Sequence, residues 1–396
     1  MQIPKQRFTS RFKWHIITGS AFVLTAGTLF GFVAINAPHR SEARIGTVTF
    51  ATINGQSTMQ LSTDGNMAPL QQPQTAAQSE IIKPVDDAPA RVAQLSQTLP
   101  KPKLKTNSVQ TIVTPKKIVP PTPTDPSLKM YVAPTLAALG APQAIASQPV
   151  AQWFGGWTPN VSSAVNDTVT AAANSGAAPV LVAYNIPERD CGSYSAGGAN
   201  GGDAYSAWIR QFAAGIGQRS AIVILEPDAL AGMGCLDATS QRARMSLIAD
   251  AVTVLKGTTG ASVYIDAGNA RWIGVKTMAS RLEAANVGLS DGFSLNVSNF
   301  ISTPESRRYG DELAQSVGKR YVIDTSRNGR GPAPNNQWCN PRGRALGERP
   351  TTNTGQTYVD AYLWIKVPGE SDGSCNGGPG AGGWWADYAN ELLANS

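Results

Sequence analysis

Residues 221–228 read Ala-Ile-Val-Ile-Leu-Glu-Pro-Asp, a short apolar run that ends in two acids. Six similar runs occur along the chain, and stretches with helical spacing, 203–216, 238–256 and 304–317, separate some of them. The seven runs are Lys129–Val132, Pro179–Tyr184, Ala221–Leu225, Ser262–Ile265, Gly292–Leu295, Arg320–Ile323 and Ala361–Ile365. Asp237 and Thr239 are plausible N-caps of the second helical stretch. Continuous β-branched runs bounded by helices indicate buried parallel strands, so about seven β/α units predict an α/β fold, a parallel β/α barrel or a closed variant of one.

Polar or acidic groups lie in the segments that follow six of these runs. They include Asp190 and Cys191, Glu226 and Asp228, Asp266, Asn296 and Asn299, Asp324, and Glu370 and Asp372. One acid after a strand is usually a helix cap, but all strands of a parallel barrel end on the same face, where active sites are built. Six such ends in register therefore predict an active site.

The charge of the chain is unevenly distributed. The formal net charge of +6 arises from +7 in residues 1–125 and −1 in residues 126–396. The larger part has no excess of basic charge for a polyanion, which argues against a nucleic-acid partner and favours a neutral substrate.

Histidine is absent from the larger part, because His15 and His39 both precede residue 126. This excludes Ser-His-Asp or Cys-His catalysis and His-ligated zinc there, and leaves carboxylates as the main proton-transfer groups. Eight of the nine tryptophans lie in this part. Flat aromatic faces can cover the apolar faces of sugar rings, although about half of these side chains are expected in the core.

The four cysteines, Cys191, Cys235, Cys339 and Cys375, contain no CxxC pair. In an exported protein they suggest two disulfides with three possible connectivities, of which pairing between sequence neighbours is the simplest. Four reduced cysteines in a cytosolic protein are the alternative.

The N-terminal 40 residues predict export. Four basic residues precede an apolar run of 20 residues, Ile16 to Ile35, and Ser41-Glu42-Ala43 offers a cleavage site. The length lies between a signal peptide and a spanning helix, and we favour an uncleaved anchor that places the rest of the chain outside.

Residues 41–125 are rich in Gln, Thr, Ser, Pro, Ala and Lys, and a Pro/Thr-rich stretch, 119–124, lies near their end. Such a segment cannot bury enough apolar surface to offset its chain entropy, so we expect a disordered, extended linker. A small β module within 45–62 is the alternative, because Ile45, Val48, Phe50 and Ile53 alternate weakly.

Seven stretches in residues 126–396 resemble, in order, the motifs of glycoside hydrolase family 6, the inverting endoglucanases and cellobiohydrolases. They are Tyr184–Cys191, Leu225–Leu230, Tyr264–Gly274, Gly292–Phe300, Val322–Pro332, Trp338–Gly355 and Leu363–Gly373. The resemblance implies a distorted, TIM-like β/α barrel that hydrolyses β-1,4-glucan with inversion and without metal or cofactor. It also implies disulfides Cys191–Cys235 and Cys339–Cys375. We expect the catalytic domain, 126–396, to be monomeric.

The resemblance also implies roles for individual residues. Asp228 matches the general acid, Asp190 the aspartate that helps to keep the pKa of the acid high, Asp372 the candidate base, and Tyr184 the tyrosine that favours ring distortion. Trp153, Asp266, Asn269, Trp272, Asn299, Trp338, Lys366 and Glu370 are the expected substrate-binding residues.

The expected chemistry is consistent with these roles. A carboxyl beside a second carboxylate in a poorly solvated site has a raised pKa, as a general acid requires. Inversion needs room for a water molecule between the sugar and the base, with carboxyls about 6.5–9.5 Å apart. For Asp372 the alternative is a salt bridge to a nearby Arg or Lys, with water activated indirectly through Asp190.

Two positions depart from the family pattern. Ala196 stands where many members have a water-holding serine, a role that Ser195 or Ser193 could take, and Asn269 stands where many have histidine. Weaker water positioning is the alternative at Ala196. Asn269 can still hydrogen-bond a sugar hydroxyl, so we expect altered affinity rather than lost chemistry there.

The last disulfide loop is short, and Asn376–Gly383 leads directly to Trp384 and Trp385. This leaves no room for a long roof, so an open cleft and endo cleavage are expected, with a cellobiohydrolase as the alternative. A non-catalytic glucan-binding surface protein and a metal-dependent hydrolase are the rival interpretations.

Overall fold

The computed structural model describes residues 47–53, 56–62 and 128–396 of the chain. The chain divides into two compact units, Met1–Asn107 and Ser108–Ser396. In the first unit, strands β1 (Thr47–Ile53) and β2 (Gln56–Ser62) pair in antiparallel fashion. These strands fall within the segment expected to be a linker, where weak alternation gave the alternative of a small β module.

The predicted N-terminal anchor, residues 1–40, and most of the predicted linker lie outside the described residues. Within the part of the chain that the structure does describe, none of the helices combines the length and the apolar character that crossing a membrane requires.

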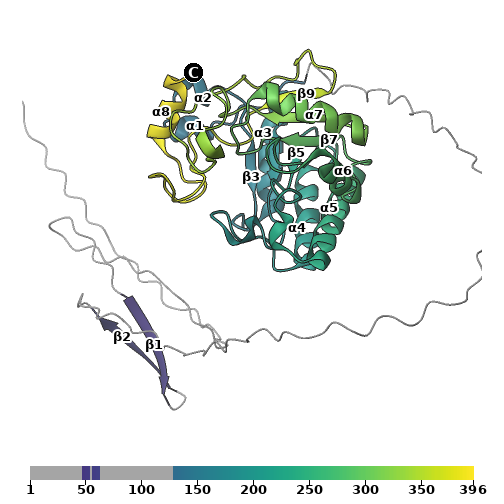
Figure 1. The fold of residues 1–396 in the computed structure, drawn as a ribbon. Helices are drawn as coiled ribbons and strands as arrows, with labels where there is room; N and C mark the ends of the chain where they lie inside the picture. The colour runs from purple at the N-terminus through teal and green to yellow at the C-terminus, as the bar shows by residue number, and fades with distance from the viewer. Residues whose placement is uncertain (1–46, 54–55, 63–127) are drawn as a thin grey trace, which may run out of the picture. The chain divides into compact units, whose positions relative to one another are not determined.

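The second unit is built on a seven-stranded parallel sheet in which the strands follow one another in chain order (Figure 1). The strands are β3 (Gln152–Phe154), β4 (Val180–Ala183), β5 (Ile222–Leu225), β6 (Ser262–Asp266), β7 (Gly292–Leu295), β8 (Arg320–Asp324) and β9 (Val359–Leu363). The two edges approach one another, because Val150, just before β3, forms a parallel bridge with Trp364, just after β9. The predicted distorted barrel is confirmed.

One predicted strand is wrong and one was missed. Lys129–Val132 forms only a single bridge, between Met130 and Ala178, because helix α1 (Thr135–Ala138) begins soon after it. The first strand of the sheet is instead β3, whose Gln152 and Trp153 are half-buried. Its three residues are too few to show an apolar run in the sequence.

Helices connect the strands, and the three predicted helical stretches are confirmed as α4, α5 and α7. The described helices besides α1 are α2 (Gln143–Ala146), α3 (Val161–Asn174), α4 (Gly202–Ile216), α5 (Ala238–Thr258), α6 (Val275–Ala284), α7 (Thr303–Val317) and α8 (Ala386–Ala394). Asp237 caps α5, since its side chain accepts a hydrogen bond from the Ser240 backbone N–H at 2.7 Å.

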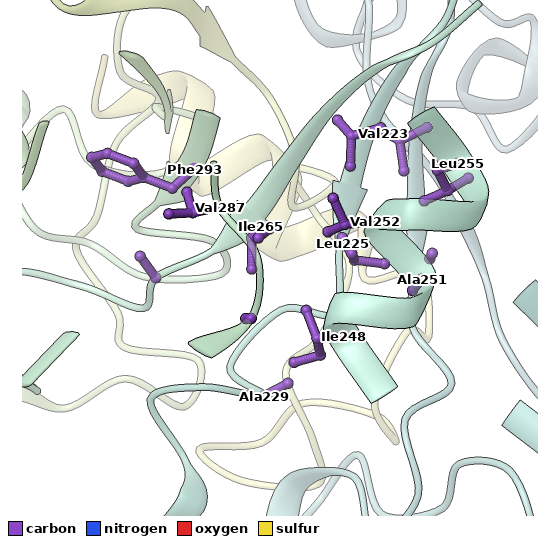
Figure 2. Packing of buried hydrophobic residues seen from close by; sticks show 14 of the residues in the cluster. Val223, Leu225, Ala229, Ile248, Ala251, Val252, Leu255, Ile265, Val287 and Phe293 are labelled. Carbon is purple, nitrogen blue, oxygen red and sulfur yellow. The ribbon is translucent and has the colours of Figure 1, made fainter. Parts of the chain in front are cut away.

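Side chains alternate between two cores along each strand, because successive residues point to opposite faces of a sheet. Val223 and Leu225 pack against Ile248, Val252 and related residues of α5 in the outer core (Figure 2). Their neighbours Ile222 and Ile224 point the other way, into a second cluster that fills the barrel interior. Both faces of the sheet are therefore buried, and the polar residues that follow the strands lie at one rim of the barrel.

Candidate active site

A cavity of about 1000 Å³ lies at the carboxyl ends of the strands. It is lined by all the predicted catalytic residues and by every predicted substrate-binding residue except Asp266. These residues are Asp190, Asp228, Asp372, Tyr184, Trp153, Asn269, Trp272, Asn299, Trp338, Lys366 and Glu370. The structure therefore brings together side chains from loops that are up to about half the chain apart.

The loops that carry Asp190 and Asp228 contain left-handed backbone. Glu188 and Asp190 follow β4 with φ of 54° and 56°, and Glu226 and Asp228 follow β5 with φ of 51° and 66°. For residues other than glycine this conformation costs roughly 1–2 kcal/mol each, so contacts must hold it.

Glu226 supplies part of that support from below the cavity. Its buried carboxylate accepts hydrogen bonds from the backbone N–H groups of Asn185 and Ile186, at 2.9–3.0 Å, and thereby ties the β4 loop to the end of β5. Burial raises the pKa of Glu226 to about 7, against the opposing effect of these hydrogen bonds.

Asp228 is half-buried and faces three other carboxylates. Burial above all, and then the negative charges of Asp266, Asp190 and Asp372, hold the pKa of Asp228 well above its ordinary value. A carboxyl in this environment keeps its proton to higher pH than an ordinary aspartate does, which favours the protonated state that a general acid needs.

Asp266 is placed differently from what we expected. It is fully buried, and its oxygens accept hydrogen bonds from the backbone N–H groups of Asp228 and Gly268 and from the Ser294 hydroxyl, at 2.8–2.9 Å. The expectation that Asp266 lines a sugar subsite is therefore corrected: its carboxylate is engaged beneath the loop that carries Asp228. Burial raises the pKa of Asp266 to about 7.

Replacing Asp266 with Asn should make Asp228 more acidic. The amide oxygen can still accept from the Asp228 N–H, but the negative charge that disfavours ionisation of Asp228 is removed. The lower pKa of Asp228 should move the alkaline limb of the kcat–pH profile to lower pH. Ser294→Ala, which removes a hydrogen bond but no charge, is the control, and an equal shift in both variants would contradict this account.

Asp190 is fixed by its own loop. Its Oδ2 accepts a hydrogen bond from the Ser195 backbone N–H at 2.8 Å. Arg189, which the sequence reasoning missed, donates to the carbonyl oxygens of Tyr184, Ser195 and Ala196 at 2.7–3.1 Å. Its guanidinium also lies 4.5 Å from the centre of the Tyr184 ring, which holds that ring at the cavity wall.

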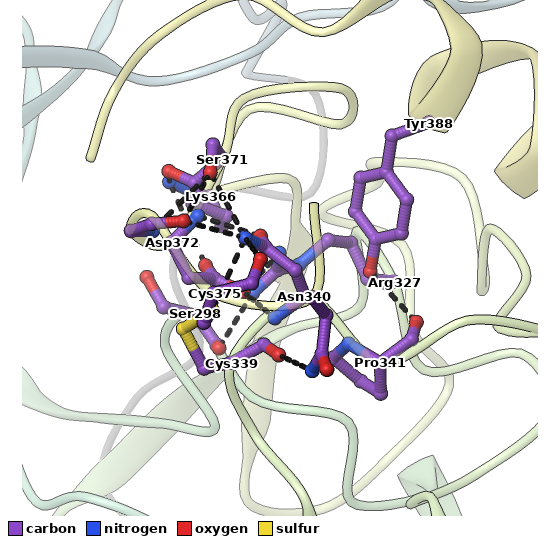
Figure 3. A network of polar contacts seen from close by, with 12 residues as sticks. Ser298, Arg327, Cys339, Asn340, Pro341, Lys366, Ser371, Asp372, Cys375 and Tyr388 are labelled. Atoms are coloured by element: carbon purple, nitrogen blue, oxygen red, sulfur yellow. Dashed lines mark hydrogen bonds and ion pairs between the residues drawn. A yellow bond between two sulfur atoms is a disulfide. The ribbon is translucent and has the colours of Figure 1, made fainter. Parts of the chain in front are cut away.

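Asp372 lies in a buried polar network (Figure 3). Its Oδ2 accepts from Arg327 Nη1 at 2.9 Å and from the Asn340 backbone N–H at 3.0 Å. The Lys366 Nζ lies 3.7 Å from Oδ1. The salt bridge that was the alternative expectation for Asp372 is thus present.

Half of the described tryptophans line the cavity, as the composition suggests. Trp153, Trp157, Trp272 and Trp338 line the cavity, and the last three are about half exposed. The other four described tryptophans, Trp208, Trp364, Trp384 and Trp385, do not. The Trp153 indole N–H donates to the Ile365 carbonyl at 2.8 Å, which fixes its ring orientation.

The two disulfides pair as the resemblance implied, Cys191 with Cys235 and Cys339 with Cys375. The first joins the loop of Asp190 to the loop that follows Asp228. The second joins Cys339, next to Asn340, to the loop that carries Asp372. Each disulfide therefore connects two parts of the cavity wall.

Several residues that organise the site were not assigned by the sequence reasoning. Asp324, at the end of β8, accepts backbone hydrogen bonds from Ser298, Ser326, Ile365 and Lys366 at 2.9–3.2 Å. Its place at a strand end was a signal, as it was for Glu226. Arg189, Arg327 and Asn340 gave no such signal, because their partners are set by the tertiary fold.

A metal site is not evident in the part of the chain that the structure describes, where no three His, Cys, Asp or Glu side chains cluster in a metal-binding arrangement. Backbone N–H groups donate to the carboxylates of Asp190, Glu226, Asp266 and Asp324, and cationic side chains pair with Asp372.

Comparisons with known proteins show the family of the chain. A sequence model of the family described as Glycosyl hydrolases family 6 matches residues 128–396. Endoglucanase A of Cellulomonas fimi is 45% identical over 285 residues, which cover 68% of this chain and 62% of that protein, so the chain spans less than two thirds of this relative. Endoglucanase 1 of Streptomyces halstedii is 45% identical over 267 residues, 65% of this chain and 81% of that protein.

A solved structure with the same architecture is that of the endoglucanase Cel6 from Mycobacterium tuberculosis, in complex with methyl-cellobiosyl-4-deoxy-4-thio-β-D-cellobioside. It is 46% identical, with a TM-score of 0.65, and the match covers 68% of this chain and 97% of that one.

Proposed function

Because the chain belongs to glycosyl hydrolases family 6, we propose that it is an endo-β-1,4-glucanase that inverts the anomeric centre. The observation that carries the proposal is the position of Asp228, whose pKa is raised well above the ordinary value, chiefly by burial, in a cavity with Asp190, Asp372 and exposed tryptophans. The relative from Mycobacterium tuberculosis binds a thio-linked cello-oligosaccharide, which supports β-1,4-glucan as the substrate class.

In the proposed reaction Asp228 gives its proton to the glycosidic oxygen as the bond between this oxygen and C1 breaks. A water molecule attacks C1 from the opposite face and loses a proton to a carboxylate. Tyr184, held between Arg189 and Trp153, would press on the ring that must distort.

For the base we propose Asp372. Arg327 and Lys366 hold its carboxyl group at the cavity wall, and Oδ1 makes only a long contact of 3.7 Å, to the Lys366 Nζ, which leaves this oxygen available to a water molecule. The alternative, in which Asp190 holds the attacking water through its loop, is supported by the Ser195 N–H that orders this carboxylate. Azide rescue of Asp372→Ala, with an inverted glycosyl azide as product, would support Asp372, and failure of rescue would favour the alternative.

Endo cleavage is supported by the short loop after Asp372, of which Ala381 and Gly382 lie at the cavity wall. The test is the viscosity of carboxymethyl cellulose followed together with the release of reducing ends. An endoglucanase lowers the viscosity steeply while few ends have formed. Cellobiose as the main early product, with nearly constant viscosity, would indicate a cellobiohydrolase instead.

Assays on carboxymethyl cellulose also distinguish the two rival functions. A non-catalytic glucan-binding protein would bind the polymer and release no reducing ends. A metal-dependent hydrolase would lose activity in excess chelator, whereas we expect the activity to persist.

We also propose that the protein is exported, with its N-terminal segment as a membrane anchor or a cleaved signal, and that the catalytic domain is monomeric. The two disulfides support an oxidising compartment. Protease accessibility of the domain on intact cells, and its mass in solution, are the corresponding measurements.

A further inference from the structure

The two loops that carry Asp190 and Asp228 have matching backbone conformations, and something must hold them against one another. Glu188 and Asp190 in one loop, and Glu226 and Asp228 in the other, all have positive φ. Left-handed residues other than glycine persist where surrounding contacts over-determine them. The contacts of Glu226 and Asp266 described above engage backbone N–H groups, whereas arginine side chains engage carbonyl groups of these loops.

One of these arginines, Arg244 on the second turn of α5, contacts both loops. Its side chain is buried, and its Nη2 donates to the carbonyl oxygens of Pro187 at 2.8 Å and Glu188 at 3.0 Å. Its Nη1 lies 3.4 Å from the carbonyl oxygen of Ala229, the residue after Asp228. One planar guanidinium therefore contacts both loops, close in sequence to each carboxylate.

We propose that Arg244 is a positioning residue that sets the placement of Asp190 relative to Asp228 by bridging the backbones of their loops. The proposal deepens the proposed glycosidase function and rests on it for its catalytic consequence. It requires the forked geometry of the guanidinium rather than its charge alone, because a single ammonium group presents no planar fork of donors to two loops.

Another arginine provides a natural comparison. Arg281, on α6, also donates to backbone carbonyls of the β5 loop, those of Leu230 and Ala231, at 2.6 and 3.3 Å. Both of its acceptors belong to the same loop. Arg281 thus has the same chemistry as Arg244 and a neighbouring position, but it does not bridge the two loops.

The disulfide Cys191–Cys235 also joins the two loops, but it differs from Arg244 in position. Both cysteines are exposed, and Cys235 is seven positions after Asp228 along the chain. At the β4 loop the disulfide starts directly after Asp190, but at the β5 loop it ends far from Asp228, whereas Arg244 reaches the Ala229 carbonyl next to Asp228.

The electrostatic consequence follows from the groups that face Asp228: Asp190, Asp266 and Asp372, and the Tyr184 ring. Arg244 itself faces Glu188 and Glu226. If the Asp190 loop moved away, Asp228 would lose one of the negative charges that disfavour its ionisation, and its pKa would fall. The alkaline limb of the activity profile would then move to lower pH.

The test compares Arg244→Lys with Arg281→Lys in the full chain, since both variants keep the charge. The first readout needs no substrate: the pH titration of the Asp228 carboxyl carbon, in protein with ¹³C-labelled aspartate, assigned by its absence in Asp228→Asn. The second is the kcat, KM and pH profile on cellohexaose. We expect Arg244→Lys to titrate at lower pH than the wild type and to lose on the order of tenfold to a hundredfold in kcat, with KM nearly unchanged. Arg281→Lys should behave like the wild type.

The Asp190→Asn variant tests whether Arg244 affects the titration of Asp228 through the charge of Asp190. In Asp190→Asn the charge is already gone, so adding Arg244→Lys should shift the Asp228 titration no further. An unchanged titration in Arg244→Lys, an equal shift in Arg281→Lys, or a full additional shift in the Asp190→Asn background would overturn the proposal.

If Arg244→Lys does not fold, Arg244→Gln takes its place with the same expected shift. Failure of both to fold while Arg281→Lys folds would also overturn the proposal, because Arg244 would then be a general structural residue. If the wild type does not hydrolyse glucan but Asp228 still titrates at lower pH in Arg244→Lys, the proposed function is wrong and the positioning role of Arg244 stands.

Discussion

Asp228→Asn is expected to lower kcat on cello-oligosaccharides by on the order of 100- to 10,000-fold, the usual contribution of a positioned general acid. The amide has nearly the same shape and keeps the backbone contact to Asp266, but it has no acidic proton to give to the leaving oxygen. The measurement is the steady-state hydrolysis of cellohexaose at the pH optimum of the wild type.

The leaving group provides the control for this prediction. Fluoride leaves without protonation, so hydrolysis of β-cellobiosyl fluoride should fall far less than hydrolysis of cellohexaose in the same variant. Asp203→Asn, an exposed change on α4, should leave both substrates unaffected. Equal losses on the two substrates would mean that Asp228 acts in binding or folding rather than as the acid.

The second large effect concerns the buried cation beneath Asp372. Arg327 is completely buried, donates to Asp372 at 2.9 Å and to the Ser298 carbonyl at 2.6 Å, and lies over the Phe300 ring. Arg327→Met should lower the free energy of unfolding by about 3–5 kcal/mol, because it leaves a buried carboxylate without its main partner. Lys366, 3.7 Å from Asp372, favours the lower end of this range.

Urea denaturation followed by tryptophan fluorescence measures this loss, and the chain offers a matched control. Arg342 pairs with Glu391 in a salt bridge of 2.5 Å, but its side chain is 53% exposed. Arg342→Met should therefore change the free energy of unfolding by less than about 1 kcal/mol. Similar stabilities for the two variants would show that the Arg327 network does not stabilise the fold as described.

The strand ends are the part of the site that the sequence predicts well. A parallel strand needs a continuous apolar run, and an acid at the end of that run is visible without any knowledge of the fold. Asp190, Asp228 and Asp372 were found in this way and given roles by their motifs. Six of the seven strands of the sheet coincide with predicted runs. The exception, β3, is three residues long and half-buried, so it has no apolar run to detect.

What a strand-end acid contacts is less visible in the sequence. Asp266 and Asp228 both occur where a buried strand ends. The Asp266 carboxylate accepts backbone hydrogen bonds beneath a loop, whereas Asp228 lines the cavity. The difference depends on where the neighbouring loop runs. Arg244 shows the same limit, because its acceptors at Pro187 and Glu188 are more than 50 residues away.

The ¹³C titration of the Asp228 carboxyl in the wild-type full chain tests the central claim most directly. We expect this resonance, identified by its absence in Asp228→Asn, to titrate well above the ordinary range for aspartate. A carboxyl that is already ionised in acid solution would contradict the assignment of Asp228 as the proton donor.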